Sequence, residues 1–101
     1  MTFIASIEIE PLPGSKMEGN RKGALVYCLI PAASRKVAKR RLQAALEEDK
    51  YRLLRTELLE DYANFRWENA KDQLEYDGLA KRAALNNDVV YGPFFSWERD
   101  E

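Results

Sequence analysis

Apolar positions in this chain form several strand-like runs separated by two segments with helical spacing. The longest unbroken run covers residues 24–30 and stops at Pro31, which cannot donate a backbone hydrogen bond to a sheet. Because this run has no polar alternation, it predicts a central strand that is covered on both faces, or covered on one face and paired in an oligomer on the other.

Three further segments have strand-like patterns. Residues 3–10 alternate, with Ile4 as the one apolar residue out of phase, and predict a half-buried strand. Residues 51–59 predict a third strand, although their Leu and Glu content also fits an extension of the preceding helix. Residues 89–97 are β-branched and aromatic and predict a last strand, with Gly92-Pro93 indicating an edge position or a bulge.

Two segments have the spacing of helices laid on a sheet. Ser34 is a good N-cap, and the pattern predicts a helix from Arg35 to about residue 49. A second helix is predicted over about residues 74–85, with an inner face of Leu79, Ala80, Ala83 and Ala84. Gly78 weakens its start, so Asp77 is a candidate N-cap.

Residues 60–73 are polar with three embedded rings, and we expect an ordered loop that Tyr62, Phe65 and Trp67 pin to the protein. The elements then follow the order ββαβαβ. We expect one α+β domain over residues 1–101, with residues 98–101 frayed. The predicted architecture is a two-layer sandwich in which a four-stranded, mainly antiparallel sheet carries both helices on one face. The order of the strands within the sheet does not follow from the sequence.

The composition is that of an ordinary globular domain, with 46% hydrophobic and 33% charged residues. No apolar run approaches the roughly 20 residues that span a bilayer, and the first residues lack the pattern of a signal peptide. A single cysteine fits a reducing compartment. We therefore expect a cytoplasmic protein with no membrane partner.

Several catalytic chemistries are excluded because the chain contains no histidine. Cys28 lies inside the most apolar run, which favours a small buried hydrophobe over a thiol nucleophile. No nucleotide-binding turn is present, and the carboxylates match no known cation loop. The sequence predicts a protein that is not an enzyme, with no catalytic, cofactor-binding or metal-binding residues.

The charges of the first predicted helix run against its dipole. Its bases (Arg35, Lys36, Lys39, Arg40 and Arg41) crowd the first two turns, whereas its acids (Glu47, Glu48 and Asp49) come last. None of the bases has an acid three or four residues later in the helix. Three sources of compensation are open: internal pairing with the second half of the chain, an acidic protein partner that could be a second copy, or a nucleic acid. The pI of about 5.6 argues against a dedicated nucleic-acid binder.

Aromatic side chains are concentrated in the last predicted strand. On a regular strand Tyr91, Phe95 and Trp97 share one face and Phe94 the other, unless a bulge at Gly92-Pro93 shifts the register. These rings either form an exposed patch of the kind found at interfaces or are buried under the loop of residues 60–73.

The leading hypothesis is a small, non-enzymatic protein-interaction or regulatory domain, expected to be a homodimer that pairs through the open sheet face or an edge strand. A second hypothesis is a small-molecule-binding or sensing domain, which requires Trp67 and Trp97 to line a common cavity. A third is nucleic-acid binding by the basic helix, which is not favoured. The candidate interaction surface comprises Arg35, Lys36, Lys39, Arg40, Trp67, Tyr91, Phe94, Phe95 and Trp97.

Overall fold

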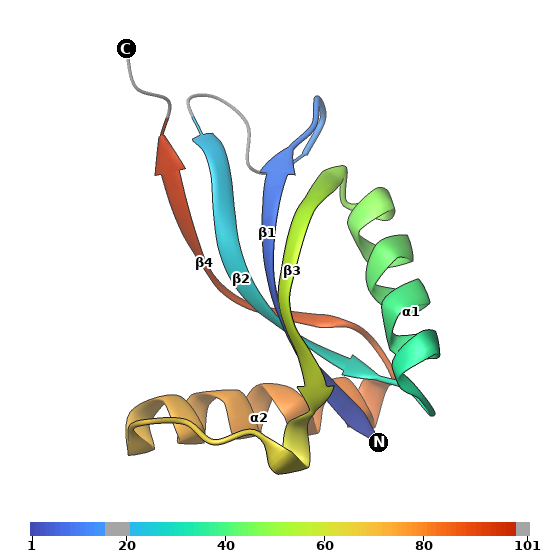
Figure 1. Ribbon diagram of the computed structural model, residues 1–101, viewed down its shortest axis with the longest axis vertical. Helices are drawn as coiled ribbons and strands as arrows, with labels where there is room; N and C mark the ends of the chain where they lie inside the picture. Colours follow the sequence, from blue (N-terminus) through green and yellow to red (C-terminus); the bar gives the residue numbers. More distant parts are fainter. Residues whose placement is uncertain (16–20, 99–101) are drawn as a thin grey trace.

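The computed structural model describes residues 1–15 and 21–98. Within them the elements are β1 (Thr2–Pro11), β2 (Arg21–Pro31), α1 (Arg35–Glu48), β3 (Tyr51–Asp61), the 3-10 turn η1 (Tyr62–Asn64), α2 (Ala70–Asn86) and β4 (Val90–Glu98). The strands form one antiparallel sheet in the order β3-β1-β2-β4 (Figure 1). The predicted α+β class and the element order ββαβαβ are confirmed. Most of the tail that we expected to fray, residues 98–101, lies outside the described residues.

One face of the sheet packs against α1. Strand β1 contributes its alternating apolar residues to this face, and β2 adds Val26, Cys28 and Ile30. The helix contributes Ala38, Leu42 and Leu46, all buried and spaced four residues apart. These side chains form the larger of two hydrophobic clusters.

The opposite face packs against α2, so the prediction that both helices lie on one face is wrong. Ile4 and Leu29 are paired across β1 and β2, and both contact a second cluster that includes Tyr76 and Ala83 of α2. Successive side chains of a strand point to opposite faces, so Ile4 and Leu29 need cover that α1 cannot provide. In Figure 1, α1 runs beside β3, whereas α2 crosses the other end of the sheet near the N-terminus.

The central position predicted for the second strand is confirmed. β2 pairs with β1 on one side and with β4 on the other, and its residues enter both hydrophobic clusters. Its continuous apolar run is therefore explained by a helix on each face of the sheet rather than by an oligomer.

Helix α1 begins and ends close to the predicted residues. The Ser34 hydroxyl accepts a hydrogen bond from the Val37 amide at 3.2 Å, and Asp49 is the C-cap. Helix α2 begins four residues earlier than predicted, at Ala70. Its N-cap is Asn69, whose side-chain oxygen accepts from the Asp72 amide at 2.8 Å, so Asp77 is an interior residue and not the cap.

The segment between β3 and α2 is ordered by its rings, as predicted. The Trp67 ring stacks on the buried Tyr76 ring with 4.3 Å between centroids, and the Tyr27 ring of β2 lies 5.0 Å from it. The Tyr62 hydroxyl donates to Asp77 at 2.7 Å. Burial and this hydrogen bond raise the pKa of Tyr62 to about 12. This aromatic cluster joins α2 to the sheet.

The Gly92-Pro93 segment shifts the register of β4 against β2. Tyr91 is opposite Cys28, and Phe94 is opposite Val26, so three steps along β4 match two along β2. The bulge that the sequence left open is therefore present, and it places Tyr91 and Phe94 on the α1 face and Phe95 on the other.

Replacing Gly78 by alanine is expected to stabilise the protein by about 0.5–1 kcal/mol, because glycine in a helix interior loses more backbone entropy on folding than alanine does. Gly78 lies inside α2, and an added Cβ would have nothing within 4 Å. Urea denaturation of the two proteins measures the difference. A lower unfolding free energy for G78A would contradict this account of α2.

Replacing Gly92 by alanine is expected to destabilise the protein by about 1–3 kcal/mol, because it overpacks the aromatic cluster. A Cβ at Gly92 would lie 2.7 Å from the Tyr76 ring, which is held by its stacking on Trp67. The same denaturation experiment tests it, with G78A as the matched glycine-to-alanine control. Equal stabilities of G92A and the parent protein would show that the ring can move aside at no cost.

Candidate interaction surface

The candidate residues do not form one continuous site. The four bases of the candidate surface lie on α1, on one side of the sheet, whereas Phe95 points from β4 to the opposite side. Trp67 belongs to the α2 aromatic cluster. The side chain of Trp97 lies outside the described residues. The sequence therefore grouped residues that the fold separates into different surfaces.

Two of the five bases of α1 bond to main-chain carbonyls. Arg35 donates to the carbonyl of Leu59 in β3. Arg41 donates to the carbonyl of Pro31 at 2.6 Å and also bonds Asn87, the C-cap of α2, through its side-chain oxygen at 3.0 Å and its carbonyl at 2.5 Å. These two arginines connect α1 to β2, β3 and the end of α2.

The other three bases, Lys36, Lys39 and Arg40, are exposed on α1. In the described part of the chain no carboxylate lies within 4.0 Å of any of them, since the ion pairs found there are Arg52–Glu10, Arg55–Glu8 and Arg55–Glu57. Ion pairs within the described part of the chain therefore do not compensate the charges of these three bases.

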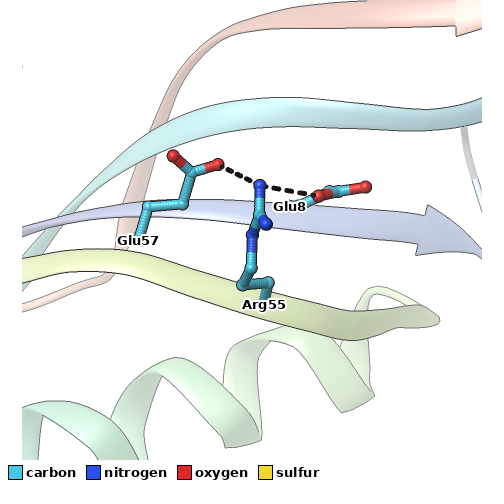
Figure 2. Close-up of polar contacts among 3 residues, drawn as sticks. All are labelled: Glu8, Arg55 and Glu57. Atoms are coloured by element: carbon cyan, nitrogen blue, oxygen red, sulfur yellow. Dashed lines mark hydrogen bonds and ion pairs between the residues drawn. The ribbon is translucent and has the colours of Figure 1, made fainter.

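The ion pairs that do form lie mainly across β1 and β3 (Figure 2). Arg55 is placed between Glu8 at 3.6 Å and Glu57 at 2.9 Å. Glu8 points away from α1, because it alternates with the β1 residues that face this helix. Glu57 is thus occupied by Arg55, although it borders the same groove as Lys39.

A groove of about 510 Å³ runs between α1 and the edge strand β3. Its apolar lining comes from Leu42, Leu53, Leu58 and Leu59, and its charged lining from Arg35, Lys39 and Glu57. Because β3 is the outermost strand, its outer backbone groups have no neighbouring strand in the sheet. The groove and this edge form a continuous surface, which we call the α1–β3 surface.

The rings of β4 are divided between the two faces of the sheet. Tyr91 and Phe94 pack with Tyr51 beside α1, with centroids 5.8–6.3 Å apart. The Tyr91 hydroxyl donates to Asp49 at 2.9 Å, and burial together with this carboxylate raises the pKa of Tyr91. These two rings belong to the core beside α1, and the loop of residues 60–73 packs elsewhere, in the α2 cluster.

Phe95 is the described β4 ring that remains exposed, with 60% of its surface accessible. It lies opposite Leu25 of β2, which is 38% exposed. Both point to the sheet face on which α2 packs. Because α2 covers only the opposite end of that face, Leu25 and Phe95 form a small apolar patch that α2 leaves uncovered.

Nucleophilic and metal chemistry have little support in the described residues. Cys28 is fully buried, and burial raises the pKa of its thiol, so the thiol is protonated at neutral pH. Its predicted role as a small buried hydrophobe is confirmed. Among the described side chains, no three Cys, Asp or Glu residues are arranged to hold a metal ion.

Neither α1 nor α2 is long and apolar enough to cross a membrane, and the other described segments contain no such helix. No protein-family model, no curated protein and no solved structure matches the chain.

Proposed function

We propose that this protein is a non-enzymatic interaction domain that binds an acidic protein partner through the basic side of α1 and the adjoining α1–β3 surface. The observation that carries the proposal is that Lys36, Lys39 and Arg40 are exposed and that no described carboxylate pairs with them. They also crowd the positive end of a helix dipole. An acidic partner would relieve both costs.

The chemistry of the groove favours a protein over a nucleic acid. Its leucines suit aliphatic side chains, whereas proteins that bind single-stranded nucleic acids usually offer aromatic platforms for base stacking. The exposed ring Phe95 lies on the other side of the sheet from α1.

The alternative of a small-molecule sensor has less support. It requires Trp67 to line a cavity together with Trp97. The Trp67 ring is instead stacked on Tyr76, and its indole N–H donates to Tyr62 at 3.2 Å. These contacts are those of a residue that holds the fold together.

Changing Lys36, Lys39 and Arg40 together to glutamine is expected to leave the unfolding free energy unchanged or to raise it by a few tenths of a kcal/mol. The reason is that the like-charge pair Lys36–Arg40 is removed and no described ion pair is lost. Chemical denaturation of both proteins measures the effect. A loss of about 1 kcal/mol or more would mean that these bases are paired internally, and the proposal would fail.

Arg41→Gln is the matched control on the same helix. Because Arg41 bonds Pro31 and Asn87, its loss is expected to destabilise the protein by about 1–3 kcal/mol. A denaturation experiment that detects this change but none in the triple variant distinguishes the structural arginine from the three bases that have no partner among the described residues.

Fluorescence anisotropy with labelled poly-glutamate and a labelled single-stranded oligonucleotide tests the partner class. We expect poly-glutamate to bind at low salt and the triple variant to lose that binding, because the three bases supply the attraction. Tighter binding of the oligonucleotide would favour the nucleic-acid hypothesis instead. Equal poly-glutamate binding by the parent protein and the triple variant would remove α1 from the interaction.

A further inference from the structure

Strand β3 carries an inverted repeat of charge. Residues 52–60 read RLLRTELLE, so Thr56 has the same types of residue at equal distances on both sides, with arginine exchanged for glutamate. Leucines occupy the two positions between the charges on each side. This symmetry lies on an edge strand, where a further strand can be added.

An antiparallel pair of identical strands has a twofold axis, and each residue then faces the residue at the equal distance on the other side of that axis. With the axis at Thr56, every arginine faces a glutamate and every leucine a leucine. The facing positions are 52 with 60, 53 with 59, 54 with 58, and 55 with 57. Opposite charges and apolar pairs in direct register are the contacts that stabilise neighbouring strands.

We propose that the acidic partner of the α1–β3 surface is a second copy of this chain, which pairs with it antiparallel through β3 about Thr56 and joins the two sheets into one of eight strands. This inference rests on the proposed function and supplies its partner.

The sheet geometry is compatible with this register. β3 has two bulges against β1, because Glu57 and Leu54 have no partner in the β1 register. Each bulge shifts the alternation of side chains by one residue. Because there are two, residues beyond both bulges again point to the faces expected for a regular strand. Arg52 is paired with Glu10 and Glu60 with Ile4, so both point to the face opposite α1. Leu53 and Leu59 are paired with Ile9 and Ala5 and both point to α1. In the joined sheet, position 52 therefore lies on the same side as position 60, and position 53 on the same side as position 59.

The charges of α1 agree with the same axis. Arg35 bonds Leu59, so the basic end of α1 lies near the acidic end of β3, and the acidic end of α1 lies next to Tyr51, where β3 begins. The twofold axis reverses this order in the second copy. The basic first turn of each α1 would then lie at the same end as Glu47 and Glu48 of the other copy, which supplies the missing carboxylates.

The existing ion pairs do not prevent this exchange. Arg52 and Arg55 bond Glu10, Glu8 and Glu57 within the chain, but both arginine side chains are more than 60% exposed. Exposed pairs of this kind contribute little stability. Charges and bulges also protect an edge strand from aggregation, but protection does not require an arginine and a glutamate at matching distances from one residue.

Two charge-reversal variants test the register. R52E/R55E makes all four charged positions of residues 52–60 acidic, and E57R/E60R makes all four basic. We expect the parent protein to dimerise in analytical ultracentrifugation, and each variant to dimerise at least about tenfold more weakly, because all four facing pairs become like-charged. An equimolar mixture of the two variants is expected to restore a heterodimer, because every facing pair is again opposite in charge.

K71E/R82E on α2 is the control, since it changes the same number of exposed charges away from β3, and its dimer is expected to match the parent's. Circular dichroism checks that every variant is folded. A parent dimer that both variants retain, or a mixture that stays monomeric although both variants are folded, overturns the β3 register. A parent protein that is monomeric at all concentrations overturns self-association. If that monomer still binds poly-glutamate through Lys36, Lys39 and Arg40, only the second copy is excluded, and the proposed function survives.

Discussion

Strand β2 is apolar on both faces and β1 adds Ile4 to the second face, and the rest of the fold follows from the need to cover both faces. Neighbouring residues such as Ile4 and Ala5, or Cys28 and Leu29, are fully buried although they point in opposite directions. A single helical layer can remove only one of these faces from water. One helix therefore packs on each side, α1 through Leu42 and Leu46 and α2 through Tyr76 and Ala83.

The surfaces available to a partner are those that this arrangement leaves open. α2 covers one end of its face, so Leu25 and Phe95 remain exposed near the other end. α1 lies over β3 and leaves a groove along the edge of the sheet. The three bases that point away from the core find no carboxylate among the described residues, whose ion pairs involve Arg52 and Arg55 instead.

Helix α1 and strand β3 have the same polarity of charge along the chain, with bases first and acids last. Because they run antiparallel, the basic end of the helix lies near the acidic end of the strand, and the Arg35–Leu59 hydrogen bond holds them in this order. In a dimer with a twofold axis at the β3 edge, the basic part of β3 would face the acidic part of β3 in the second copy. The basic end of α1 would likewise lie beside the acidic end of the second α1. The proposed twofold dimer would therefore account both for the reversed helix charges and for the inverted repeat in β3.

Local patterns in the sequence were enough to identify the four strands, the bounds of α1, the two-sided burial of β2 and the inert character of Cys28, because each depends on residues that are neighbours in the chain. Ile4, which is out of phase with the alternation of β1, indicates cover on the second face already in the sequence. The face that each helix covers, the strand order β3-β1-β2-β4 and the start of α2 at Ala70 depend on contacts between distant segments. The register at Gly92-Pro93, and with it the separation of Phe95 from Tyr91 and Phe94, likewise required the packing of β4 on β2. Which bases of α1 find partners was decided by tertiary structure alone, because Leu59, Pro31 and Asn87 reach Arg35 and Arg41 only in the folded chain.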